Sequence, residues 1–284
     1  MDLFENHLHE NQTMKGKFVP MTSMASGLVQ QIAEGVFACT IQIVNIAFIQ
    51  TNTGFVIIDT GMPESEEMIF NMIEEKFGEG AKPEAIILTH GHFDHIGSIE
   101  KLLERFSDTP VYAHPLEIPY LTGQKNYPEP DGTVEGGLVA KLSPMFPNVG
   151  INLSKHIKPL PDNGKVPLLP EWKWIHTPGH SDGHVSLFRE KDGTLIAADA
   201  FITVKQDSLY KVLVQEQEIC GPPRYFTTDW KLAKQSVEKL AALHPKVALT
   251  GHGLPIEGEE LERGLTRLVN EFDTIATPDY GKYV

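Results

Sequence analysis

The order of apolar and polar positions along the chain predicts strands first, with helices between them. Residues 36–52 and 54–61 are β-branched and aromatic runs separated by Asn and Gly, which predicts several strands paired as hairpins. Residues 63–79 carry Pro and acids in the first turn and apolar side chains at helical spacing, which predicts an amphipathic helix. The apolar run 85–90 then predicts a short buried strand that ends at His90.

The second half of the chain repeats strands and helices in a similar order. Apolar positions after residue 98 predict a helix, and residues 110–114 predict another strand. Further strands are expected at 171–176, 184–188, 194–201 and 246–252, and further helices at 228–244 and 261–272. Because no Ser/Gly linker separates the halves, we expect a single domain over residues 1–284, with two β-rich halves packed face to face and helices outside.

Two segments depart from this pattern. Residues 1–33 form a polar N-terminal segment, whose His7 and His9 could chelate a metal weakly but fit a mobile polar tail better. Residues 115–160 are rich in Pro and Gly, which predicts a long insertion with one short helix. Long insertions in compact domains often carry function, so we expect this one to line a site, with a decorated surface loop as the alternative.

The composition excludes some partners. The 284 residues include 24 basic and 38 acidic side chains, which gives a net charge of −14 with neutral histidines. Such a field repels phosphate backbones and anionic lipid headgroups, so we expect a small-molecule substrate and neither nucleic acid nor a membrane as partner. Bound divalent cations reverse the sign locally, so an anionic substrate stays compatible with this charge. The sequence leaves the oligomeric state open, a homodimer included.

The sequence also predicts a compartment. The N-terminus lacks the apolar core of a signal peptide, and no later stretch approaches the roughly eighteen apolar residues of a membrane span. Cys39 and Cys220 lie far apart and form no CxxC pair, so neither a disulfide framework nor a thiolate metal site is indicated. We therefore expect a cytoplasmic protein.

The candidate chemistry is concentrated in residues 89–98, THGHFDHIGS, where three histidines and an aspartate stand almost side by side. A strand that ends at His90 and turns at a glycine can point His90 and His92 to one spot, while Asp94 and His95 point to a neighbouring one. Imidazole and carboxylate groups are good ligands for Zn, Fe and Mn ions. The motif therefore predicts a pair of metal ions.

One motif supplies too few ligands to complete two metal sites, so further donors are expected later in the chain. His180, Asp199 and His252 each follow a run that predicts a buried strand. The ends of such strands are the usual place for ligand sites in α/β folds. We expect these three side chains to join the motif.

With these residues in place, the sequence resembles a known family. HGHFDH fits the H-x-H-x-D-H signature of the metallo-β-lactamase superfamily, and IIDTG, TPGHSDGH, AADA and TGHG resemble its other motifs in the same order, from about residue 36 to 256. The resemblance implies an α/β fold, a four-layer αββα sandwich of two mixed β-sheets with helices on both outer faces. It also implies a site at one edge, between the two sheets.

The resemblance assigns metal ligands to seven matching positions. One ion would be held by His90, His92 and His180, a second by Asp94, His95 and His252, and Asp199 would bridge the two. We expect two divalent ions, with Zn²⁺ as the first choice and Mn²⁺ or Fe²⁺ as alternatives.

Other residues beside the motifs have supporting roles in this scheme. Asp59 matches a family aspartate that resembles an orienter of a ligand imidazole through its other N–H, with helix capping as the alternative. His184, Thr89 and Thr177 sit beside ligands and could do similar work or serve as plain structural hydrogen-bonders. Four histidines match no motif and are expected to be structural: His114, His156, His176 and His244.

The implied function is a binuclear metal-dependent hydrolase. Two cations about 3.5–4 Å apart share a water and lower its pKa to about 7, which supplies hydroxide as nucleophile. Asp94 is the candidate catalytic residue, because it could orient the hydroxide or pass a proton to the leaving group. The expected substrate is small and ester-like, a thioester, lactone or phosphoester, with residues 115–160 and 204–226 as walls of a partly apolar pocket.

Departures from the family's patterns narrow the choice of substrate. A quorum-quenching lactonase would be expected to have a tyrosine shortly after Asp199, where this chain has Phe201 and Ile202, and Tyr210 is a weak substitute. A glyoxalase II would need a basic C-terminal extension, a nuclease a basic surface, and an antibiotic-degrading lactamase an export signal. The alternatives to a hydrolase are a mononuclear iron persulfide dioxygenase and a non-catalytic metal-binding protein.

Overall fold

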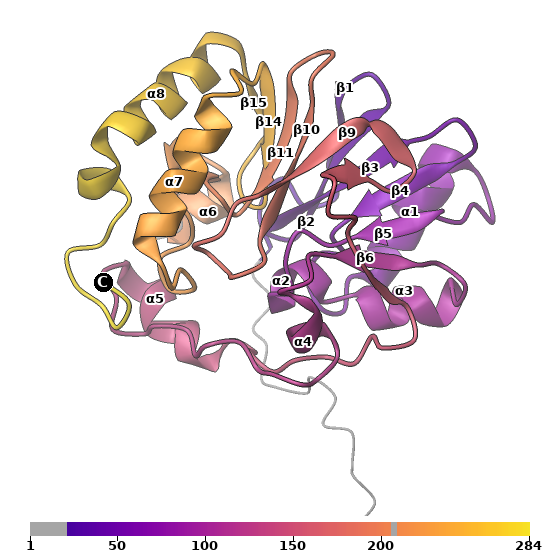
Figure 1. The fold of residues 1–284 in the computed structure, drawn as a ribbon, viewed down its shortest axis with the longest axis horizontal. Coiled ribbons are helices and arrows are strands. Elements are labelled where there is room, and N and C mark those ends of the chain that lie inside the picture. The colour runs from indigo at the N-terminus through magenta and orange to yellow at the C-terminus, as the bar shows by residue number, and fades with distance from the viewer. Residues whose placement is uncertain (1–21, 206–208) are drawn as a thin grey trace, which may run out of the picture.

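Two β-sheets face each other at the centre of the molecule, and helices cover both outer faces (Figure 1). The computed structural model describes residues 22–205 and 209–284, so His7 and His9 lie outside the described residues. In spatial order, the first sheet contains β1 (Val29–Ala33), β2 (Val36–Ile41), β3 (Val44–Gln50), β4 (Phe55–Ile58), β5 (Ala85–Ile87), β6 (Val111–Ala113) and β7 (Ile157–Pro159). Its first four strands are antiparallel and the others parallel.

The second sheet is also mixed, because β11 and β14 run parallel and its other neighbours antiparallel. In spatial order it contains β15 (Ile256–Glu257), β14 (Val247–Thr250), β11 (Thr194–Ala198), β10 (Val185–Arg189), β9 (Leu169–His176) and β8 (Lys165–Val166). A separate two-stranded sheet pairs β12 (Ile202–Val204) with β13 (Gln217–Cys220).

The longer helices lie outside the sheets. The described helices are α1 (Glu66–Phe77), α2 (Phe93–Ile96), α3 (Ile99–Arg105), α4 (Ile118–Leu121), α5 (Gly137–Leu142), the 3₁₀ helix η1 (Ser143–Met145), α6 (Leu209–Val214), α7 (Trp230–Ala241) and α8 (Gly258–Ile275). Over the described residues, no helix combines the length and the apolar character that crossing a membrane requires.

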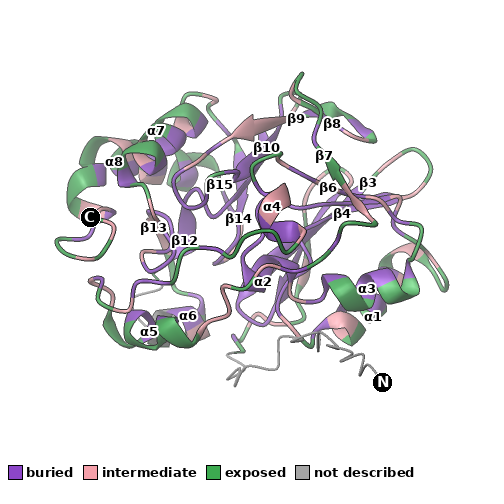
Figure 2. Cartoon of the chain, turned by 60° about the horizontal axis from the view of Figure 1, so that its bottom comes forward, coloured by how far each residue is buried: buried purple, intermediate pink, exposed green. Residues whose placement is uncertain are grey.

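Three apolar layers hold the sandwich together. One fills the space between the first sheet and helices α1 and α3, one lies between the two sheets, and one lies between the second sheet and helices α7 and α8. In β2, Phe37 and Cys39 belong to the first layer, whereas Val36 and Ala38 belong to the middle one. Figure 2 shows that most of the strands are buried, whereas most exposed residues lie on the helices and loops. The predicted four-layer sandwich is therefore present.

The strand predicted at 85–90 is shorter than expected and ends at Ile87. Beyond it, the Thr89 N–H donates to the Asp59 carboxylate at 2.8 Å, and the Thr89 carbonyl accepts from Val185 N of the facing sheet at 2.9 Å. The backbone therefore leaves its own sheet before His90, which lies in a loop rather than at a strand end. The backbone of Thr89 thus bonds to the facing sheet, a contact between distant segments that an apolar pattern cannot predict.

The insertion at residues 115–160 also differs from its prediction. It contains α4, α5 and η1 rather than one short helix, and it adds β7 to the edge of the first sheet. Pro and Gly interrupt any apolar period here, so the pattern gave no basis for these elements.

Candidate metal centre

The candidate site lies where strands of both sheets end. From the first sheet, β4 leads to Asp59 and β5 leads to the loop and short helix α2 over residues 89–96. From the second sheet, the chain reaches the site after β9, β11 and β14. All the predicted ligands are buried: His90, His92, Asp94, His95, His180, Asp199 and His252.

Among the described residues, three groups of side chains have ligand atoms within 4.8 Å of one another. They are His90, His92 and His180; His90, His95 and Asp199; and Asp94, His95 and His252. These groups contain the seven positions that the sequence assigned to metal ions and no other described residue. The fold thus brings together side chains that are far apart along the chain.

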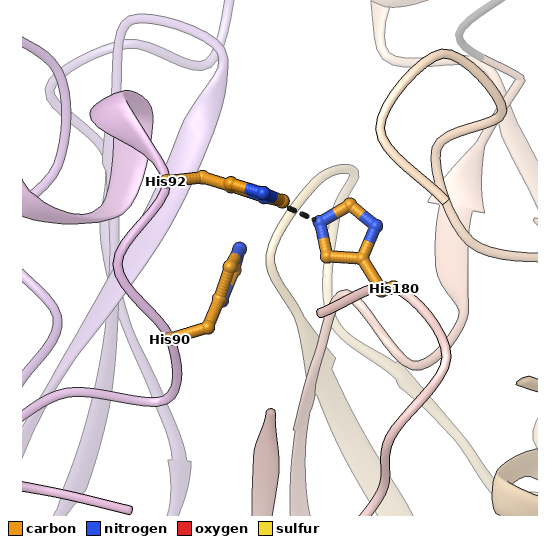
Figure 3. Close-up of side chains that lie close together, drawn as sticks. All are labelled: His90, His92 and His180. Atoms are coloured by element: carbon orange, nitrogen blue, oxygen red, sulfur yellow. Dashed lines mark hydrogen bonds between the residues drawn. The ribbon is translucent and has the colours of Figure 1, made fainter. Parts of the chain in front are cut away.

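The three-histidine group joins one loop from each half of the molecule (Figure 3). His92 Nδ1 lies 2.9 Å from His180 Nε2, and the His90 ring centroid lies 4.7 Å from that of His92 and 4.9 Å from that of His180. A hydrogen bond between two imidazole nitrogens needs one proton between two lone pairs. A cation can replace that proton and bind both lone pairs.

The carboxylate of Asp199 stands between this group and the second one. Its Oδ2 lies 3.4 Å from His180 Nε2 and 3.5 Å from Nε2 of both His95 and His252. Asp94 Oδ2 lies 3.3 Å from His252 Nε2. Asp199 is therefore placed to touch ligands of both groups.

Asp59 orients two of the imidazoles. Its Oδ2 lies 2.8 Å from His95 Nδ1 and accepts a hydrogen bond of 2.7 Å from the Thr89 hydroxyl. Because that hydroxyl donates to Asp59, its oxygen accepts from His90 Nδ1, which lies 3.1 Å away. Both rings then carry a proton on Nδ1 and direct Nε2 at the centre, which is the arrangement expected of an orienting aspartate.

The imidazoles of His180 and His252 also have a hydrogen-bond acceptor at Nδ1. The Thr227 hydroxyl donates to the Pro223 carbonyl at 2.8 Å and lies 3.3 Å from His180 Nδ1, so its oxygen is the acceptor. His252 Nδ1 lies 3.0 Å from the carbonyl oxygen of Ile43, which can only accept. These contacts also leave the Nε2 atoms facing the centre.

Burial keeps the three-histidine group neutral. It lowers the pKa of His90 and of His180 well below the ordinary value, and neighbouring imidazoles lower both further. Burial lowers the pKa of His92 to about 4, although Asp94 opposes the shift. Neutral imidazole is the form that binds a metal ion.

In the second group, which contains Asp94, His95 and His252, the pKa values of the histidines are raised rather than lowered. Burial disfavours a charge on His252, but Asp199 and Asp94 raise its pKa to about 10. Burial opposes charge on His95 too, yet Asp199 and Asp59 hold its pKa well above the ordinary value. Protons on these two rings balance the buried carboxylates when no cation does.

The residues present fit a pair of divalent cations. Among the described residues, four buried donor atoms of the centre make no hydrogen bond: His90 Nε2, His95 Nε2, Asp94 Oδ1 and Asp199 Oδ1. Each unpartnered buried polar atom costs about 1–3 kcal/mol, so four at one place point to a ligand that satisfies them. Nitrogen and oxygen donors without thiolate suit Zn²⁺, Mn²⁺ and Fe²⁺.

His184 lies beside the centre but belongs to none of its ligand groups. Its Nδ1 lies 2.8 Å from the Thr177 hydroxyl, and its Nε2 accepts a hydrogen bond of 3.1 Å from the backbone N of Asp199. The ring therefore fixes the backbone that carries Asp199. Burial lowers the pKa of His184 to about 3, which keeps it neutral for this contact.

The histidines without a motif stay outside the ligand groups. His114 and His176 stack with ring centroids 4.3 Å apart and planes 12° apart, at the ends of β6 and β9. His156 is half-buried and His244 is exposed, and neither belongs to a group of potential ligands.

The sequence predicted residues 115–160 and 204–226 as walls of the site but did not single out the residues that surround His92. The Phe226 ring stacks on it at a centroid distance of 4.5 Å, and the Tyr127 ring meets it edge-on at 4.7 Å. Glu117 is fully buried and hydrogen-bonded to loops on both sides of the centre. The available signal was an acid inside the otherwise apolar stretch PLEIPYL.

A glycine leaves room for the Asp199 carboxylate. A Cβ at position 251 would overlap Asp199 Oδ1 and lie 2.8 Å from His95 Cε1. Any side chain at Gly251 would therefore displace ligands of the centre.

Comparisons with known proteins agree with this arrangement. The family model of the metallo-beta-lactamase superfamily matches residues 39–252. A relative from Bacillus subtilis (strain 168), named probable metallo-hydrolase YflN, is 49% identical over 265 residues, which cover 92% of this chain and 100% of the relative.

Solved structures share the fold. The structure of TTHA1623 in a di-iron-bound form matches with a TM-score of 0.51 and 26% identity, over 75% of this chain and 89% of that one. The metallo-beta-lactamase family protein TTHA1429 from Thermus thermophilus matches with a TM-score of 0.59 and 20% identity, over 86% of this chain and 81% of that one. The sandwich, the clustered histidines and the family match lead to one conclusion: the chain belongs to the metallo-β-lactamase superfamily.

Proposed function

We propose that the protein is a binuclear metal-dependent hydrolase that acts on a small ester-like molecule, a thioester, lactone or phosphoester. The observation that carries the proposal is the convergence of seven buried donors, four of which have an unpartnered atom. The name of the relative YflN, probable metallo-hydrolase, supports hydrolysis, and the di-iron-bound form of TTHA1623 supports a pair of ions.

Each half of the centre would hold one ion, Zn²⁺ in the first instance and Mn²⁺ or Fe²⁺ as alternatives. The donors would be His90, His92 and His180 for one ion, Asp94, His95 and His252 for the other, and Asp199 for both. Bound as a pair, such ions supply hydroxide at neutral pH and a Lewis acid for the substrate oxygen.

Asp94 is the residue best placed to hold a proton during the reaction. Its Oδ2 contacts His252 at 3.3 Å, while its buried Oδ1 has no hydrogen-bond partner. Although burial opposes it, the hydrogen bond from His252 lowers the pKa of Asp94, so the side chain is a carboxylate at neutral pH. One oxygen can thus accept a proton at the centre and return it to a leaving group.

Aromatic side chains surround His92 and favour a substrate with an apolar portion. Phe226 and Tyr127 contact the His92 ring, and Phe93 lies 5.6 Å from Phe146 of the insertion between ring centroids. Aromatic surroundings with a few polar groups are typical of sites that bind small molecules. The net charge of −14 further favours a small molecule over nucleic acid.

The test is a substrate screen with protein of measured metal content. Protein loaded with Zn²⁺, Mn²⁺ or Fe²⁺ is counted for metal by mass spectrometry and assayed on thioesters, lactones and p-nitrophenyl phosphodiesters. We expect two ions per chain and hydrolysis that a chelator abolishes. One iron per chain with oxygen uptake on a persulfide would replace the proposal by the dioxygenase, and two ions without turnover on any class would favour a non-catalytic metal-binding protein.

The role of Asp94 has its own test. Replacing Asp94→Asn removes the proton acceptor while keeping an oxygen ligand, so turnover should fall about 10²-fold or more at matched metal content. Full turnover by metal-replete D94N protein would exclude the role.

A further inference from the structure

Glu117 is a fully buried carboxylate of the insertion, just before α4, that lies between two loops of the centre. Its Oε2 accepts a hydrogen bond of 3.1 Å from the backbone N of Gly91. Its Oε1 accepts bonds of 2.9 Å from the backbone N of Gly183 and 2.7 Å from the Ser181 hydroxyl. The Tyr127 hydroxyl also donates to Oε2. Every partner of this carboxylate is a donor.

The two backbone donors decide which side chain fits here. The N–H of Gly91 points at one oxygen of Glu117 and the N–H of Gly183 at the other, and neither group can accept. A carboxylate satisfies both, whereas an amide turned either way presents its NH₂ group to one of them. Burial raises the pKa of Glu117, but its hydrogen bonds from Tyr127, Ser181 and both glycines favour the ionised form.

The loops reach Glu117 because both contact points are glycines. A Cβ at position 183 would lie 2.7 Å from Glu117 Cγ, and a Cβ at position 91 would overlap the Tyr127 hydroxyl and lie 2.9 Å from Leu121 Cδ2. Cβ atoms do not approach other atoms this closely, so both positions require glycine. Glu117 of the insertion therefore packs between the two loops and contacts both.

Among the described residues, the hydrogen bonds of Glu117 reach only the segments that carry the three-histidine group. Gly91 separates His90 from His92, and Ser181 follows His180, so the carboxylate ties together the two segments that supply the three-histidine group. The other half depends on different contacts, from Asp59 to His95 and from the Ile43 carbonyl to His252.

We propose that Glu117 is a positioning residue that sets the separation of His90 and His92 from His180, and with it the affinity of this group for its ion. The inference rests on the proposed binuclear centre. Losing the carboxylate should weaken one ion selectively and leave in place the ion of the other group, Asp94, His95 and His252.

The test measures both affinities in full-length protein. Wild-type and Glu117→Gln protein, stripped of metal, are titrated with Zn²⁺ in competition with a chromophoric chelator, which resolves two dissociation constants. Loss of a residue that supports metal ligands typically weakens binding about 10–100-fold. We expect a change of this size in one constant of E117Q and little change in the other.

Double variants identify which ion is affected. His92→Ala removes a donor of the three-histidine group, and His252→Ala removes a donor of the other. Adding Glu117→Gln to H252A should weaken binding of the ion that remains, because that ion is held by the three-histidine group. Adding it to H92A should change little, because the ion that remains is then held by the other group, which has its own supporting contacts. The reverse pattern, or equal weakening of both ions by E117Q, would overturn the inference.

The chain offers a matched control in Asp131, a second buried carboxylate of the insertion, which accepts hydrogen bonds from Thr133 at 2.9 and 2.6 Å. Asp131→Asn should keep both affinities, which separates the Glu117 contact from general loosening of the insertion. If E117Q does not fold, Ser181→Ala removes one donor and should weaken the same ion to a smaller extent. Wild-type protein with fewer than two ions would refute the proposed function, whereas two ions with unchanged constants in both variants would refute only this inference.

Discussion

Single side chains in the centre are prepared for metal ions by their partners. Asp59 fixes the ring of His95 directly and that of His90 through Thr89, so the Nε2 atoms of both rings face inward. Protons on His95 and His252 balance the carboxylates in the same space. Metal binding at this half must therefore release protons.

Outside the centre, the stacked pair His114 and His176 predicts a pH dependence of stability. Burial, with His176 beside it, lowers the pKa of His114 to about 4, whereas an unfolded histidine titrates at about 6.5. Unfolding therefore takes up a proton between these values, and stability is lost as the pH falls from 6.5 to 4. His114→Asn keeps an acceptor for the Leu116 N–H and cannot titrate, so its stability should fall less over this range.

The measurement is the free energy of unfolding in urea at pH 7.5 and 4.5, with chelator present for both proteins. The wild type should lose more between the two values than H114N. Equal losses would show that His114 titrates alike in the folded and unfolded chain.

At this scale the sequence singles out residues that follow a regular run of apolar positions. His180, Asp199 and His252 were predicted as a group because each follows a strand-like segment, and all three lie at the centre. Glu117 and Phe226 lie in irregular segments, whose path depends on contacts far along the chain. No local period encodes such contacts.

Among the elements, the N-terminus of α7 supports the loop that carries His180. The Gly179 carbonyl accepts hydrogen bonds from the backbone N of Thr228 at 3.1 Å and of Asp229 at 3.0 Å. Asp229 also caps the helix, because its Oδ1 accepts from the Leu232 N at 2.8 Å. The helix end and the ligand loop are therefore fixed together.

This contact makes Gly179 a sensitive position. Its φ is +129°, which side chains rarely adopt, and a Cβ there would overlap the backbone of Ala233 in α7. Gly179→Ala should lower the free energy of unfolding by about 1–3 kcal/mol. It should also weaken binding of the ion proposed for the group that contains His180, because the loop must move.

Urea unfolding and the chelator titration measure the two effects. Gly78→Ala is the control, since Gly78 has a φ of +97° with nothing near its Cβ position and lies at the end of α1. It should lose stability while keeping metal affinity. Unchanged metal affinity in G179A would mean that the loop does not depend on the helix.

The limits of element prediction have a physical cause. Helix α7 begins near its predicted start because an aspartate cap marks it, and β11 begins at Thr194 as predicted but ends at Ala198, before the predicted end at residue 201. The run at 85–90 stops early because its backbone bonds across to the other sheet at Thr89. An apolar pattern indicates that residues are buried, and residues 88–90 are buried. It does not indicate which strand their backbone groups bond to.

For the molecule as a whole, the layered architecture could be predicted from the sequence because both sheets are buried on both faces. Continuous apolar runs predict strands covered on both sides, and amphipathic helices supply the cover. The order of strands within each sheet and the seating of the insertion required the structure, because both depend on contacts between distant segments.

Metal ions should stabilise the whole fold, and more so as the pH rises. Without ions, the proton on His252 contributes stability that is complete below pH 6.5 and lost as the pH rises through its pKa of about 10. A bound cation replaces this proton. One ion at 100 times its dissociation constant adds about 2.7 kcal/mol.

Thermal unfolding with chelator or with Zn²⁺, at pH 6.5 and at pH 9, checks this expectation. The increase in Tm caused by Zn²⁺ should be larger at pH 9. An increase that is the same at both values would show that ions do not replace protons in the folded chain.

Residues 279–283 run back along the insertion. Lys282 N donates to Asp131, the Tyr283 hydroxyl donates to the Glu129 carbonyl at 3.0 Å, and Asp279 N donates to Glu135 at 3.1 Å. During translation, the insertion leaves the ribosome about 150 residues before these partners do. Residues 129–135 of the insertion therefore lack these hydrogen bonds until the whole second sheet, which ends at Glu257, has been synthesised.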